Sequence, residues 1–154
     1  MLLPLDHICI TSLSPAAQLS VGLAVSIAGD DAQEVEPFHL LSAISATPGA
    51  AGADLLESFG VRVNRSEHRD SHSVAMAITP LRMTRAQPLK VSTSSFLALT
   101  EARLLAEEMG HAIVGTEHLL IAVLKNLDAE VKQTIAQAGL TADIARRTLF
   151  GDDR

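Results

Sequence analysis

The sequence predicts an all-α fold made of two tandem, pseudo-symmetric four-helix repeats. The first observation is a phrase that occurs twice, at residues 35–44 and 114–123, where a valine, a His-Leu-Leu triplet and an aliphatic stripe recur after 79 positions. The second is composition: 47% of the 154 residues are hydrophobic but only 3% are aromatic, so Ala, Leu, Ile and Val must fill the core. That core favours close-packed helices. A surface built by duplication is more often a binding platform than a catalytic pocket.

The second copy carries the clearer helix signals. Apolar residues recur at helical spacing from about residue 94 to 109. Thr116 is predicted to cap the next helix, which contains the repeated His-Leu-Leu stripe. A third helix is expected over about residues 128–138 and ends at Gly139, and Thr141 is predicted to cap the fourth.

The first copy follows the same plan. Ser14 is a cap residue followed by Pro15 at the first helical position, and Pro37 starts the second helix. The third helix is expected to stop at Gly60. Residues 63–70, which lie opposite the last helix of the second copy, have almost no apolar face and are not expected to form a stable helix.

These signals predict one compact domain over the whole chain. Repeat one covers about residues 13–65, a linker about 66–92, and repeat two about 92–150. Two short extended runs, at residues 7–11 and 74–79, could pair as a small ladder beside the helices. Packed irregular chain is the alternative for both runs.

Charge and cysteine content exclude some classes of function. A formal net charge of -6 argues against nucleic acid as the main partner, because affinity for a phosphate backbone depends on clustered Lys and Arg.

The start of the chain lacks the pattern of a signal peptide, and no apolar run approaches the roughly 20 residues of a membrane span. The single Cys9 has no internal disulfide partner, so a cytoplasmic protein is expected.

A longer motif points to a known family. Residues 110–120 read G-H-x-x-V-G-T-E-H-L-L and follow E-A-R-x-x-A at residues 101–106. This pattern resembles the second repeat of the Clp N-terminal domain family, and residues 35–43 are similar to the first repeat in the ClpB branch. The resemblance covers about residues 13–65 and 92–150. It implies a domain that docks substrates and adaptors of the Clp ATPase unfoldases.

The resemblance also directs attention to what the sequence lacks. Clp unfoldases follow this domain with ATPase modules that contain a G-x-x-x-x-G-K-[ST] loop, whose amides cradle phosphates. No such string occurs here, and the chain ends four residues after Phe150. We therefore expect a stand-alone docking domain without ATPase activity, acting as an accessory subunit, adaptor or decoy for Clp components or their substrates.

The ClpC branch suggests candidate ligand residues in repeat two. In that branch the glutamate of the Gly-Thr-Glu-His motif and a hydroxyl near the start of the repeat belong to a pocket for phosphorylated arginine. The matching residues here are Thr116 and Glu117, with Ser92 or Thr93 near the expected hydroxyl. The alternative for Glu117 is a first-turn residue stabilised by the helix dipole.

The first repeat differs at the matching positions, where Pro37 and Phe38 stand. Phe38 is either an exposed apolar contact or an interior staple. Actinobacterial members of the family resemble receptors for cyclic peptide antibiotics, through aromatic residues at the entry of each repeat. This chain has Val91 at about that point of repeat two. Sequestration of a small ligand or a cyclic peptide is the second functional hypothesis.

The remaining candidates are assigned structural roles. His39 and His118 precede a buried Leu-Leu pair, and their imidazoles are expected to bond backbone groups of a neighbouring helix rather than a metal. Gly60 and Gly139 stand at equivalent helix ends.

Catalysis and cofactor binding are not expected. His68 and His72 have helical ligand spacing but no companion ligand nearby in sequence. Cys9 has only His7 beside it, and no G-x-S-x-G elbow occurs. The sequence therefore predicts a non-enzyme with no metal and no cofactor.

Overall fold

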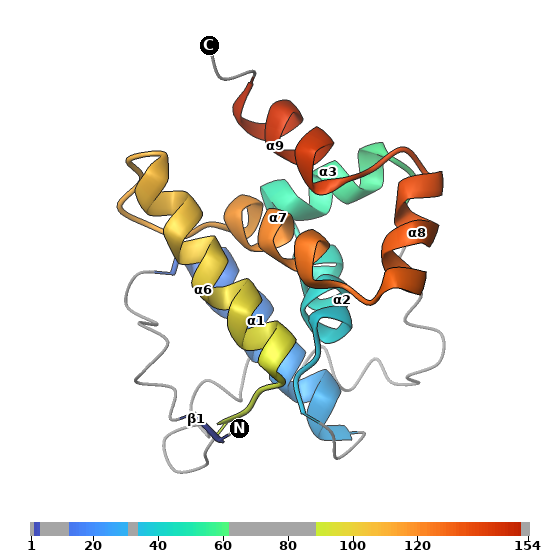
Figure 1. The fold of residues 1–154 in the computed structure, drawn as a ribbon. Helices are drawn as coiled ribbons and strands as arrows, with labels where there is room; N and C mark the ends of the chain where they lie inside the picture. Colours follow the sequence, from blue (N-terminus) through green and yellow to red (C-terminus); the bar gives the residue numbers. More distant parts are fainter. Residues whose placement is uncertain (1, 4–12, 31–33, 62–88, 152–154) are drawn as a thin grey trace.

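The structure is a computed structural model that describes residues 2–3, 13–30, 34–61 and 89–151. Seven helices and two short strands occur in these residues (Figure 1). They are β1 (Leu2–Leu3), α1 (Pro15–Asp30), α2 (Pro37–Ala46), α3 (Ala51–Ser58), β2 (Leu89–Lys90), α6 (Thr93–Glu108), α7 (Thr116–Asn126), α8 (Ala129–Gln137) and α9 (Ala142–Phe150). The all-α prediction is confirmed. We refer to α1–α3 as repeat one and to α6–α9 as repeat two.

Two helices begin at the side-chain caps that the sequence predicts. The Ser14 hydroxyl accepts a hydrogen bond from the Ala17 amide at 3.1 Å, and the Thr141 hydroxyl accepts one from the Ile144 amide at 3.3 Å. The prediction for Thr116 is wrong. Gly115 is the N-cap of α7, and Thr116 is the first helical residue.

Helix ends and strands complete the outline. Gly60 and Gly139 follow α3 and α8 with φ of 69° and 92°, a region in which a β-carbon is strained. Strands β1 and β2 pair antiparallel in a two-residue ladder. The predicted ladder of residues 7–11 with 74–79 lies outside the described residues, as do residues 63–70.

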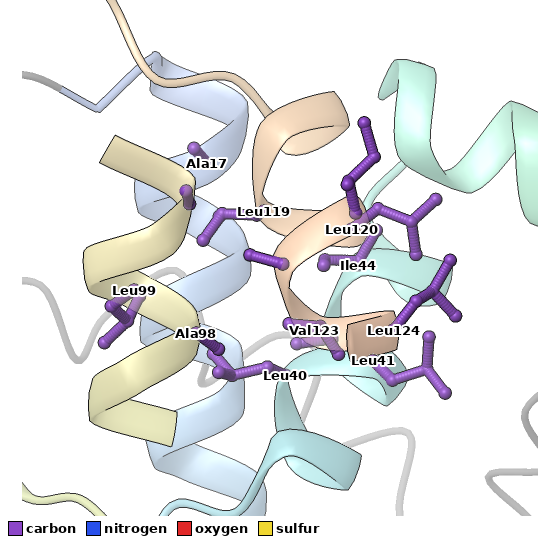
Figure 2. Packing of buried hydrophobic residues seen from close by; sticks show 14 of the residues in the cluster. Ala17, Leu40, Leu41, Ile44, Ala98, Leu99, Leu119, Leu120, Val123 and Leu124 are labelled. Atoms are coloured by element: carbon purple, nitrogen blue, oxygen red, sulfur yellow. The ribbon is translucent and has the colours of Figure 1, made fainter. Parts of the chain in front are cut away.

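Helices α2 and α7 pack against each other in the interior, α1 packs on α2, and α6 packs on α7. Figure 2 shows side chains of these four helices in one cluster. Among the described residues, every buried apolar residue of the core is Ala, Leu, Ile or Val. The low aromatic content therefore has the structural consequence that the sequence predicts.

The short segments that precede α1 and α6 pair with segments of the opposite repeat, an arrangement that we call the backbone exchange. Leu13, just before α1, forms a parallel bridge with Val114, just before α7. In the same way Val91, before α6, forms a parallel bridge with Val35, before α2. The Ser14 amide donates to the Val114 carbonyl at 2.8 Å, and the Ser92 amide donates to the Val35 carbonyl at 3.1 Å. Each repeat therefore begins beside the second helix of the other repeat.

Candidate functional site

Glu117 lies over the N-terminus of α7. Its side chain is 29% exposed, and Oε1 is 3.8 Å from Nδ1 of His118. The carboxylate folds over Gly115, because a methyl group on Gly115 would overlap it. The partial positive charge of a helix N-terminus favours a carboxylate there. Glu117 is thus held by its own helix but remains partly accessible to a ligand.

Thr116 points the other way, into the protein. The residue is only 2% exposed. Its hydroxyl accepts a hydrogen bond at 3.2 Å from the amide of Gly52, in the first turn of α3. The N-cap of α3 is Ala50, which has no side-chain acceptor for the first-turn amides. The Thr116 hydroxyl therefore caps a helix of the other repeat.

Ser92 and Thr93 lie at the start of α6. The Ser92 hydroxyl accepts from the Ser95 amide at 3.1 Å and is buried, whereas Thr93 is exposed. The structure does not bring these residues to Glu117. Helix α6 has 16 residues and so is ~24 Å long, and it is the opposite end of α6 that leads into α7. The backbone exchange instead places Ser92 beside Val35, at the start of α2.

Phe38 lies at the start of α2, at the position equivalent to Glu117. Its side chain is 43% exposed, so it does not act as an interior staple. The bridge between Val35 and Val91 brings the start of repeat two next to this segment. Phe38 is thus an exposed aromatic group where the two repeats meet.

The two equivalent histidines make the same backbone contact. Nδ1 of His39 accepts from the Glu36 amide, and Nδ1 of His118 accepts from the Gly115 amide, both at 2.9 Å. The sequence predicts contacts to backbone groups of a neighbouring helix. Each of these two contacts is instead to the N-cap residue of the histidine's own helix. The contact satisfies an amide that a helix start would otherwise leave without a partner.

His118 extends this contact into a small aromatic cluster. Its Nε2 lies 2.8 Å from Nδ1 of His111, and its ring stacks on Phe150 with centroids 5.2 Å apart. Because the Gly115 amide can only donate, Nδ1 of His118 carries no proton and the proton is on Nε2, which donates to His111. Burial lowers the pKa of His118, against the opposing effect of Glu117, and His111 lowers it further. The neutral imidazole thus joins the start of α7 to the end of α9.

Neither a cluster of metal-ligating side chains nor a membrane-spanning helix is found in the part of the chain that the structure describes. Within it, no group of three or more His, Cys, Asp or Glu side chains is placed to hold a metal ion. His68 and His72 lie outside that part. None of the described helices has the length and apolar character needed to cross a membrane.

Interlocked repeats, paired histidine contacts and polar or aromatic groups at equivalent helix starts together define an all-α tandem-repeat domain. The chain belongs to the Clp N-terminal repeat family, since the family model described as the Clp repeat (R) N-terminal domain matches residues 12–138.

Two curated proteins are similar in sequence to most of this chain. The chain is 33% identical over 119 residues to the chaperone protein ClpB of Propionibacterium freudenreichii subsp. shermanii, covering 77% of this chain and 13% of that protein. It is 29% identical over 140 residues to the chaperone protein ClpB of Mycobacterium leprae, covering 88% and 16%. The chain thus spans about one sixth or less of the length of these relatives.

Proposed function

We propose that this chain is a protein- and peptide-docking module of a Clp unfoldase system, as an accessory subunit, adaptor or decoy. The observation that carries the proposal is the match of residues 12–138 to the Clp N-terminal repeat family. The absence of a phosphate-binding G-x-x-x-x-G-K-[ST] string from the 154 residues supports a role in binding rather than in driving unfolding. Any ATP-driven step would be carried out by a separate ATPase module. A cytoplasmic location is part of the same proposal.

The direct test is capture of defined partners. The tagged chain is incubated with cytoplasm of the source organism, and Clp ATPase and Clp protease subunits are quantified by mass spectrometry. We expect their enrichment over an unrelated helical protein of similar size and charge. A Phe38→Ser variant tests whether the exposed aromatic group contributes. Recovery of neither Clp subunits nor known Clp substrates would contradict the proposal.

The alternative is a site for a small ligand or a cyclic peptide. A partly exposed carboxylate at the start of α7 supports a phosphoarginine-type pocket, because Glu117 could accept hydrogen bonds from a guanidinium group. The exposed Phe38 is the feature that would suit an apolar cyclic peptide. Any such pocket would have to work without the buried Thr116 hydroxyl and without Ser92 or Thr93 beside Glu117.

Thermal-shift titration separates these alternatives. A ligand at 100 times its dissociation constant stabilises a protein by roughly 2.7 kcal/mol. Phosphoarginine should raise the melting temperature of the wild type and have little effect on Glu117→Gln. A flat response to both phosphoarginine and cyclic peptides would leave macromolecular docking as the proposed function.

A further inference from the structure

Each repeat has a groove at the same place. In repeat two a groove of about 530 Å³ lies between the end of α7, α8 and the start of α9. In repeat one a groove of about 320 Å³ lies between the end of α2 and α3. Six lining positions are equivalent at the 79-residue offset, namely Ser45 and Leu124, Ala46 and Lys125, Ala53 and Lys132, Asp54 and Gln133, Glu57 and Ala136, and Val61 and Leu140. The duplication has therefore produced two grooves of one design.

The two grooves carry opposite net charges, although Asp143 also lines the groove of repeat two. Lys125 and Lys132 line the groove of repeat two, where repeat one has alanines. Asp54 and Glu57 line the groove of repeat one, where repeat two has uncharged residues. In particular, the position of Glu57 is taken by Ala136. The sequence changes that separate the repeats thus converge on the charge of this groove.

The groove of repeat two combines an apolar floor with a fixed ammonium group. Leu124, Ile135 and Leu140 are buried side chains that line it. Nζ of Lys132 donates to the main-chain carbonyl of Lys125 at 2.9 Å, near the C-terminus of α7, where the helix dipole favours a cation. An ammonium has three N–H donors, so this bond leaves donors for a ligand.

These features select the chemistry of the occupant. The groove volume lies within the roughly 300–1,000 Å³ of typical ligand pockets, and its apolar floor suits aliphatic side chains. The lysines on α7 and α8 suit a carboxylate, whereas Asp143, on the α9 side, suits the backbone amides of a peptide. A polyanion is disfavoured, because the whole chain has a formal net charge of -6.

We propose that the groove between α7, α8 and α9 binds a peptide segment in which one or two aliphatic side chains adjoin the side-chain carboxylate of a Glu or Asp. This inference rests on the proposed docking function and names the surface and the peptide chemistry. The aliphatic side chains lie on the floor formed by Leu124, Ile135 and Leu140. The carboxylate meets the ammonium groups of Lys125 and Lys132.

The probe is the peptide acetyl-Gly-Leu-Leu-Glu-Gly-amide, titrated into the isotope-labelled chain and followed by amide chemical shifts. Shifts are expected around residues 124–143 and not around residues 45–61, the equivalent acidic groove. Replacing Glu in the probe by Gln should weaken binding about two- to five-fold, as for one partly exposed charge contact. Replacing both Leu by Ser should remove detectable binding.

A substitution that copies repeat one supplies the matched test. Ala136 is exposed on α8, so Ala136→Glu and Ala136→Gln should both fold. Both fill the groove to the same extent, but only Ala136→Glu introduces the carboxylate that repeat one has. We expect Ala136→Glu to bind the probe about tenfold more weakly than Ala136→Gln, because like charges are brought together. Lys125→Gln should also weaken binding, whereas Arg103→Gln, on α6, should not.

Equal binding by the two Ala136 variants, shifts confined to another surface, or no binding at millimolar probe would overturn the groove proposal. Capture of Clp subunits is measured separately with the same variants. Capture without probe binding would contradict the groove and leave the docking function standing. Probe binding at residues 124–143 without any Clp capture would support the groove and contradict the Clp assignment.

Discussion

The hydrogen bond from Gly52 to Thr116 provides the sharpest test of how the repeats hold each other. Thr116→Val removes the hydroxyl and keeps nearly the same side-chain volume. The buried Gly52 amide then loses the acceptor that lies 3.2 Å away. An unsatisfied buried donor costs about 1–3 kcal/mol. The free energy of unfolding should therefore fall by about 2 kcal/mol.

The measurement is urea unfolding followed by circular dichroism, supported by a thermal scan. For a chain of this size about 2 kcal/mol corresponds to a drop of roughly 4–8 °C in melting temperature. Hydrogen exchange of the Gly52 amide should accelerate more than that of amides in α8. This second readout ties the loss to the contact between the two repeats.

Two controls isolate the hydroxyl. Thr116→Ser keeps the acceptor and removes one methyl group, so it should cost only about 0.8 kcal/mol. Thr93→Val changes the equivalent first residue of α6, where the hydroxyl is exposed, and should stay within about 0.5 kcal/mol of wild type. If Thr116→Val were as stable as Thr93→Val, the hydroxyl of Thr116 would not cap α3 in the way the structure indicates.

Three further predictions follow from buried contacts. Because the pKa of His118 is lowered from 6.5 in the folded state, the unfolded chain binds more protons in acid. The contribution of the neutral His118 to the free energy of unfolding should thus be fully present above about pH 6.5 and decline as the pH falls toward the folded pKa. Urea unfolding between pH 7.5 and 5 should show a smaller decline in His118→Gln than in the wild type. Gly52→Ala should destabilise by about 1–3 kcal/mol in the same assay, because its β-carbon would lie 2.8 Å from Cγ2 of Ile44 and 3.1 Å from the Thr116 carbonyl oxygen. Ser92→Ala removes the N-cap of α6 and should lower the unfolding free energy by ~1 kcal/mol, whereas Ser94→Ala should not.

Distinct outcomes would contradict these predictions. Identical pH profiles for wild type and His118→Gln would mean that the neutral imidazole is not linked to folding. A gain in stability of about 1 kcal/mol in Gly52→Ala, as helix propensity alone would give, would show that the packing of α3 against α2 and α7 is loose. Equal stabilities of Ser92→Ala and Ser94→Ala would show that the Ser92 cap does not contribute measurably to the free energy of unfolding.

Helix positions could be predicted because their signals are local. Ser14 and Pro15 start α1, and Gly60 follows α3, within a few residues of the groups they serve. Thr116 fails for the opposite reason. Its hydroxyl serves an amide 64 positions away, so the residue looks like a cap in sequence but caps a different helix. No helical or strand period signals such a partner.

The expected pocket of Ser92 and Glu117 does not form, again because of a contact between residues that are far apart in sequence. The sequence places Ser92 and Glu117 in one repeat, and a pocket formed within that repeat was the natural expectation. The exchange of segments through Val35 and Val91 moves Ser92 to the start of α2 instead. The one available signal was the pair of valines just before Glu36 and Ser92, but alternative pairings within each repeat would use the same residue types.

The structure changes the meaning of the divergence between the two copies. Pro37 and Thr116 are equivalent and both buried, but they serve different helix starts. Proline has no amide to satisfy at the start of its own helix, whereas the threonine hydroxyl accepts from an amide at the start of α3. This pair therefore serves the fold. Phe38 and Glu117, one position later, both reach solvent at the starts of the two central helices. Because the backbone contact of the histidine is the same in both repeats, the two helix starts share this feature while one presents an aromatic ring and the other a carboxylate. We propose that this difference lets the two surfaces bind different ligands.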